Sequence, residues 1–128
     1  MLPSADLLQW LRELPSRRAL HTLKEIAALL RRHREPGWDG RLGDVAVRLS
    51  AAEDARSPIE TVGLMQEILG FFAPPASLRE VYLSHEAGHK IKPEDVPAVN
   101  ALLGALRTQL LLSAMQSIAR VQWIGRRG

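Results

Sequence analysis

The sequence predicts a mainly α-helical protein, a compact bundle of about five helices with one short β-hairpin near residues 80–92. Apolar residues recur every three or four positions over most of the chain, which is the spacing of one helix face. Proline and glycine interrupt this pattern at a few places, where helices are expected to end. The 128 residues, of which 46% are hydrophobic, are enough for a single domain, residues 1–128, with one modest core.

Two helices are expected before residue 35. Ser4 can cap a first short helix that ends before Pro15, and Ser16 can cap the second. The second helix has a continuous apolar stripe, formed by Leu20, Leu23, Ile26, Ala27, Leu29 and Leu30. Glu35-Pro36-Gly37 then predicts its end.

Two more helices are expected between residues 38 and 72. The third presents the stripe Trp38, Leu42, Val45 and Leu49. The fourth begins at Ser57-Pro58-Ile59-Glu60, which combines a capping serine, a first-position proline and a capping-box glutamate. Its expected core face is formed by Ile59, Val62, Met65, Leu69 and Phe72. Ala73-Pro74-Pro75-Ala76 predicts its end.

The last helix is the longest and is expected to begin at Pro93 or Asp95. Its expected core side is formed by Val99, Leu102, Leu103, Leu106, Leu110, Ala114, Ser117 and Val121, with Met115 as a further core residue. Gly125–Gly128 is expected to be a frayed tail. This helix could serve as a dimer seam as readily as a core element, so a homodimer stays open.

One stretch matches a catalytic pattern. His85-Glu86-Ala87-Gly88-His89 has the form H-E-x-x-H, in which a helix places two histidines on one face to bind zinc and the glutamate acts as general base. A catalytic zinc needs a third protein ligand. Positions 92 and 95, where the extended metzincin pattern has glycine and histidine, hold lysine and aspartate, and the acids that follow are too close to come from a second helix. His21 and His33 stay open as ligands.

Local sequence around this motif favours a hairpin over a helix. Gly88 and Pro93 are poor helix residues. Val81-Tyr82-Leu83 and His89–Lys92 have the composition of short extended runs on either side of a turn. We therefore expect surface histidines, with no catalytic residue, no metal ligand and no cofactor. The alternative is a zinc-dependent hydrolase that uses His85 and His89 as ligands and Glu86 as base.

Composition narrows the function classes further. The chain has no cysteine, which excludes disulfides, thiolate catalysis and cysteine-ligated metals. Residues 1–6 have no signal-peptide character, and the apolar run Leu110–Leu112 is interrupted on both sides by polar residues. A cytoplasmic location, with no membrane-spanning helix and no membrane partner, is therefore expected.

Arginine dominates the basic residues, with clusters at Arg17-Arg18, Arg31–Arg34 and Arg126-Arg127. Such clusters could bind phosphates, and an arginine-rich nucleic-acid-binding bundle is a second alternative. The net charge of +3 is small for that role. Arg31–Arg34 also falls at an expected helix end, where cations suit the negative end of the helix dipole.

The order of features resembles a small bacterial helical family of mostly uncharacterised proteins over residues 20–115. The shared pieces are L-x-x-I-A-x-L-L at Leu23–Leu30, Trp38 with Leu42, I-L-x-F-F at Ile68–Phe72, S-L-x-x-[VL] at Ser77–Val81, and a loose N-x-L-x-x-L-R at Asn100, Leu102 and Arg107. The family's glycine-rich turn is replaced here by Ala73–Ala76. Proteins of this kind resemble immunity proteins, which neutralise a bacterial toxin by binding it.

The resemblance implies a non-enzymatic protein-binding module, an immunity protein that neutralises a cognate toxin by occluding it. Because aromatic residues and arginine commonly dominate such interfaces, the expected contact residues are Arg79, Tyr82, His85, Glu86 and His89 in and beside the hairpin, and Trp123 near the C-terminus. Electrostatic complementarity predicts an acidic face on the toxin opposite the arginine clusters.

Overall fold

The structure, a computed structural model, describes residues 14–127 and the side chains of residues 14–122. Within this range the chain forms four α-helices, α2 (Pro15–Arg32), α3 (Trp38–Asp54), α4 (Pro58–Gly70) and α5 (Val96–Arg127), and two short 3-10 helices, η1 (Leu78–Glu80) and η2 (Pro93–Asp95). The mainly α-helical fold is confirmed. The helix expected from Ser4 falls on residues outside the described range, and α5 continues past Gly125, where a frayed tail was expected.

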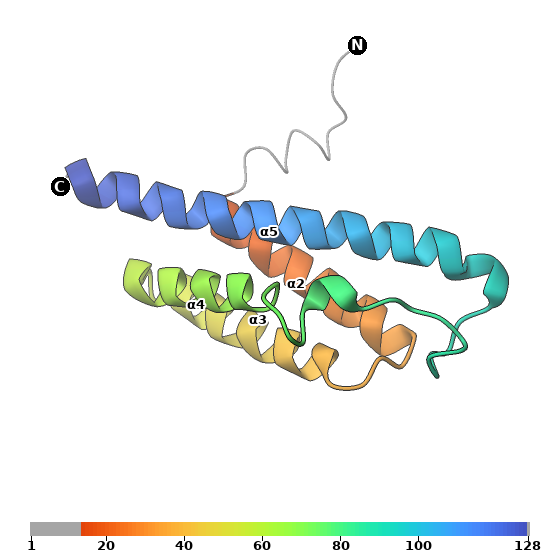
Figure 1. The fold of residues 1–128 in the computed structure, drawn as a ribbon. Helices are drawn as coiled ribbons and strands as arrows, with labels where there is room; N and C mark the ends of the chain where they lie inside the picture. The colour runs from red at the N-terminus through yellow and green to blue at the C-terminus, as the bar shows by residue number, and fades with distance from the viewer. Residues whose placement is uncertain (1–13, 128) are drawn as a thin grey trace, which may run out of the picture.

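The four helices form a ring in which each packs against two neighbours: α2 on α3, α3 on α4, α4 on α5, and α5 on α2. Successive helices run in opposite directions, and α5 extends along one side of the bundle (Figure 1). This is the up-down-up-down arrangement of a four-helix bundle. Its core is formed by apolar side chains from all four helices, including Leu23, Ile26, Leu30, Leu42, Leu49, Met65, Ile68, Leu103 and Leu110.

The two proline-led helix starts differ in their caps. At α4, the Ser57 hydroxyl accepts a hydrogen bond from the Glu60 backbone N–H at 3.3 Å, as the capping sequence predicts. At α2, Pro15 takes the first helical position and Leu14 precedes it without a side-chain cap. Ser16 as the N-cap is therefore wrong, because the fixed φ of proline already begins the helix one residue earlier.

Three apolar residues expected in the core are exposed: Ile59 (86%), Leu102 (50%) and Met115 (52%). Ile59 lies nine residues before Ile68, about 180° around the helix from that buried side chain. On α5, the neighbouring Leu103 and Ala114, also expected in the core, are fully buried. A spacing of three or four residues is shared by adjacent faces of a helix, and packing decides which face is buried.

The hairpin expected near residues 80–92 is wrong. Residues 81–84 and 89–92 form no strand, and residues 85–88 form a turn. The backbone of Leu83 pairs with a side chain: Asn100 Oδ1 accepts from the Leu83 N–H, and Asn100 Nδ2 donates to the Leu83 carbonyl oxygen, both at 2.8 Å. The side-chain amide of Asn100 on α5 therefore pairs with the Leu83 backbone as a neighbouring strand would. The Leu83 N–H and carbonyl oxygen are satisfied without a β-ladder.

The segment before Leu83 is also held by α5. The Arg107 guanidinium donates to the carbonyl oxygens of Leu78 at 3.0 Å, Arg79 at 3.1 Å and Val81 at 2.9 Å. Burial lowers the pKa of Arg107. Two polar side chains on one helix therefore fix the course of residues 78–83 along α5.

Among the described residues, one helix is long and apolar enough to cross a membrane by length and composition, Pro93–Gln122. The core helix of a globular bundle passes the same test, and this helix forms one wall of the core through Leu103, Leu106 and Leu110. The expectation that the chain has no membrane-spanning segment stays an expectation.

Candidate binding site at the basic end of the bundle

A depression of about 610 Å³ lies where the end of α2 meets the turn at residues 84–92. In Figure 1 this turn is beside the C-terminal end of α2, although the two are more than fifty residues apart in sequence. The lining residues are Arg32, His33, Arg34, His85, Gly88, His89, Lys90, Ile91, Lys92 and Asp95. We call this depression, with its four cations Arg32, Arg34, Lys90 and Lys92, the basic end.

The end of α2 gives the basic end one of its walls. The Arg34 N–H donates to the Arg31 carbonyl at 3.1 Å and the Glu35 N–H donates to the Leu30 carbonyl at 2.9 Å. This pair of bonds is a Schellman motif, which reverses the chain after a helix. It places Arg34 in the left-handed region, with a φ of 58°, a conformation that favours glycine.

His89 holds the turn to α2. Its Nδ1 accepts a hydrogen bond from the Ser84 N–H at 3.0 Å, and its Nε2 contacts Glu35 Oε2. Because a backbone N–H can only donate, Nδ1 carries no hydrogen, so Nε2–H donates to the carboxylate. The His89 side chain is 6% exposed and that of Glu35 is 15% exposed. This buried pair ties the two walls of the basic end together.

A second contact between the two chain segments lies beside the His89–Glu35 pair. The Lys90 N–H donates to the His33 carbonyl oxygen at 2.9 Å, and His33 Nδ1 donates to the Lys90 carbonyl oxygen at 2.8 Å. The two residues thus exchange a reciprocal pair of hydrogen bonds. With its backbone fixed in this way, Lys90 presents its side chain at the same depression as Arg32 and Arg34.

The four cations of the basic end have no ion-pair partner within the described part of the chain. The acids nearest to them in sequence are Glu35, which is bound to His89, and Glu86, Glu94 and Asp95, of which Asp95 lines the depression. Other arginines of the bundle are paired, as Arg48 is with Asp44 at 2.7 Å and with Glu67 at 2.6 Å. The basic end therefore offers charged donors suited to carboxylate or phosphate groups.

The expected contact residues lie in several places. His85 and His89 line the basic end, and Glu86 is exposed between them on the same turn. Tyr82 is 58% exposed. Arg79 lies at a separate depression beside Arg107, with its guanidinium 5.7 Å from the Phe72 ring centroid. The side chain of Trp123 lies outside the described residues.

The H-E-x-x-H stretch does not have the geometry that its zinc chemistry requires. Zinc proteases place both histidines on one helix face, whereas residues 85–88 form a turn here. Both ring nitrogens of His89 already make hydrogen bonds, to Ser84 and Glu35. Among the described residues, no group of three or more His, Cys, Asp or Glu side chains is arranged to hold a metal.

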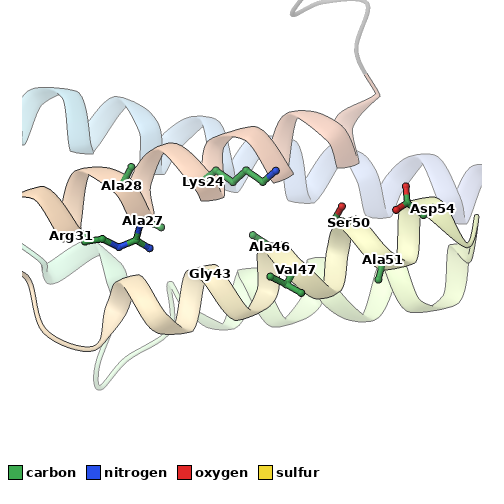
Figure 2. A pocket seen from close by; sticks show the side chains of 10 residues that line it. All are labelled: Lys24, Ala27, Ala28, Arg31, Gly43, Ala46, Val47, Ser50, Ala51 and Asp54. Carbon is green, nitrogen blue, oxygen red and sulfur yellow. The ribbon is translucent and has the colours of Figure 1, made fainter.

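A second depression, of about 540 Å³, lies between α2 and α3 (Figure 2). Its lining consists largely of small residues, which leave the space between the helices open: Ala27, Ala28, Gly43, Ala46, Ser50 and Ala51. Lys24 and Arg31 border it from α2, and the exposed Val47 borders it from α3. Arg31 directly precedes Arg32 of the basic end, so this α2–α3 groove and the basic end are neighbours.

From sequence, Arg31–Arg34 are expected at a helix end, and Lys90 and Lys92 have no expected role. Their convergence depends on the His33–Lys90 and Glu35–His89 contacts. The only sequence signals for this convergence are the arginine run at the end of the second expected helix and the pair Lys90 and Lys92 far along the chain. Searches for similar proteins give no further guide: the chain matches no family model, no curated protein and no solved structure.

Proposed function

We propose that this protein is a non-enzymatic binding module that uses the basic end to cover an acidic surface of a partner protein. The observation that carries the proposal is the convergence of four cations without ion-pair partners in the described range, from two chain segments held together by hydrogen bonds. A fixed backbone reduces the entropy lost when such side chains bind. Charge-assisted hydrogen bonds to carboxylates then supply specificity.

A protein partner suits the basic end better than a nucleic acid does. Asp95 lines the depression, and the neighbouring Glu86 and Glu94 are exposed. Carboxylates at the border repel a phosphate backbone, whose binding depends on the number of phosphates neutralised. A border of mixed charge instead matches a protein surface with the complementary pattern. The adjoining α2–α3 groove, lined by small residues with Lys24, Arg31 and Asp54 among them, adds a mixed polar and apolar surface beside it.

The sequence resemblance to immunity proteins supports a more specific form of the proposal. In that form, the partner is a cognate bacterial toxin, and binding neutralises it by covering an acidic surface. Tyr82, His85 and Glu86 are exposed on the segment that carries the turn and extend the proposed contact beyond the four cations.

Two arginines provide a matched pair of variants for the test. Arg34 and Arg56 both have positive φ, 58° and 51°, and both follow a helix in a Schellman motif. Arg34→Gly and Arg56→Gly therefore make the same change in backbone preference and net charge, but only Arg34 lies at the basic end.

The experiment captures partners from the native cells by cross-linking and then measures the affinity of the purified partner by calorimetry. We expect Arg34→Gly to weaken binding about tenfold or more, since a lost charge-assisted contact at an interface is worth at least 1.4 kcal/mol. Arg56→Gly should bind as the wild type does. Equal affinity of both variants would overturn the proposal, as would steeply salt-dependent DNA or RNA binding that only Arg34→Gly loses.

If the partner is a toxin, co-expression of the wild type should restore growth of cells that produce it, and Arg34→Gly should restore growth less well. A captured partner that is not toxic would agree with the proposed binding module but would refute the immunity role.

A further inference from the structure

The outward face of α5 is exposed and has no charged side chain over residues 98–119. Arg107, the single charged residue in this stretch, points inward to the carbonyl oxygens of Leu78, Arg79 and Val81. Large apolar side chains on the outward face include Leu112, 49% exposed, and Met115, 52% exposed. An uncharged, partly apolar face about 33 Å long is unusual for a helix that borders only solvent.

Exposed residues on this face recur at alternating spacings of three and four. The positions are Ala98, Ala101, Ala105, Thr108, Leu112, Met115 and Ala119, all exposed. This is a heptad repeat over three heptads, the pattern by which two helices coil around each other. We call these seven positions the α5 seam.

We infer that the α5 seam binds the α5 seam of a second copy in an antiparallel, two-fold symmetric dimer. A two-fold axis at Thr108 places Ala105 opposite Leu112 and Ala101 opposite Met115. Each large side chain then faces a small one, which allows close packing. Parallel pairing would place Met115 on Met115 and Ala101 on Ala101, which leaves an uneven gap.

Charge at the two ends of the seam supports the same arrangement. Glu94 and Asp95 precede it and Arg120 follows it, all of them exposed. In the antiparallel dimer, the acidic end of one copy lies near Arg120 of the other at both ends of the seam. The opposed helix dipoles also attract each other. Parallel pairing would bring like charges together at both ends.

A membrane surface is a poorer occupant for this face. Helices that lie in a membrane interface commonly combine aromatic or bulky apolar residues with lysine and arginine on the polar face. Residues 98–119 contain no aromatic residue and no lysine, and four of the seven seam positions are alanine.

The dimer is tested by sedimentation velocity over a concentration series. We expect a reversible dimer, and we expect Met115→Lys to raise its dissociation constant about tenfold or more, because the seam would bury two new charges. In the double variant Ala101→Lys/Met115→Glu, antiparallel pairing sets opposite charges face to face, so dimerisation should return. Parallel pairing would instead oppose like charges.

Cysteine cross-linking gives an independent readout, because the chain has no cysteine of its own. Thr108→Cys should form a disulfide-linked dimer on oxidation, and Ala101→Cys should do so only when mixed with Met115→Cys. Ile59→Cys, exposed on α4, is the control that should stay monomeric.

A monomer at every concentration, or self-linking by Ala101→Cys alone, would overturn the inference. Binding of the monomer to anionic lipid vesicles, lost in Met115→Lys, would assign the face to a membrane and overturn it equally. The seam and the basic end share no residue, so Met115→Lys should leave partner binding unchanged. Refutation of the α5-seam dimer therefore does not refute partner binding at the basic end, and the reverse also holds.

Discussion

Replacing Asn100 by alanine should destabilise the protein by about 3 kcal/mol. Asn100 makes three hydrogen bonds through one amide, each at 2.8 Å: it accepts from the Leu83 N–H, and it donates to the carbonyl oxygens of Leu83 and Val96. Each such bond contributes about 1 kcal/mol net, and a buried backbone group left without a partner costs more. The Leu83 side chain is fully buried, so its backbone has little access to replacement water.

The measurement is urea unfolding of the wild type and Asn100→Ala, combined with hydrogen exchange at the Leu83 amide. The loss should be a sizeable share of a typical total stability of about 5–15 kcal/mol. Exchange at the Leu83 amide should also become much faster. Gln66→Ala on α4 is the control: it changes one exposed polar side chain outside the α5 seam and should change stability by less than about 0.5 kcal/mol. A loss below about 1 kcal/mol in Asn100→Ala would refute the idea that this amide replaces a partner strand.

Other substitutions test further parts of the fold by the same unfolding measurement. Arg107→Met keeps the side-chain length but removes the hydrogen bonds that one charged nitrogen, Nη1, shares among three carbonyl oxygens, so a loss of about 3 kcal/mol is expected, and a loss below about 1 kcal/mol would count against its role. Met65→Ala should cost about 2–5 kcal/mol and Ile59→Ala less than about 0.5 kcal/mol, although both lie on the stripe that spacing predicts; equal costs would contradict the packing of α4. Arg34→Gly and Arg56→Gly should each raise stability by about 0.5–1 kcal/mol, since glycine relieves the positive φ; a loss in either would show that its side chain stabilises the folded chain.

The helices could be predicted from sequence because their signals are local. Ser57-Pro58 begins α4, Pro74-Pro75 follows its end, and the stripe from Trp38 to Leu49 lies within one helix. Spacing failed where two adjacent faces share the same period: both Leu102 and Leu103 are expected in the core, but Leu103 is buried and Leu102 is half exposed. The choice between such faces depends on neighbouring helices, which a single stretch of sequence does not specify.

Residues 80–92 were mistaken for a hairpin because their composition does satisfy the rules for extended chain. Val81 has an extended backbone, but the hydrogen-bonding partner of the Leu83 backbone is the side-chain amide of Asn100, seventeen residues away. The basic end was missed for a similar reason. Arg34 and Lys90 come together through contacts between His33 and Lys90 and between Glu35 and His89, across more than fifty residues of sequence. Propensity and periodicity carry no information at that distance.

Residues 78–90 are held by side chains that belong to other elements: Asn100 and Arg107 on α5 and His33 after α2 bind the backbone, and Glu35 binds the His89 side chain. The outward side chains of this segment, such as Tyr82, have no part in that support. Mutation can therefore alter the exposed positions while the helices keep their stability. Under the proposed binding role, substitutions in this one segment would change the specificity of the contact while the helices that support it stay the same.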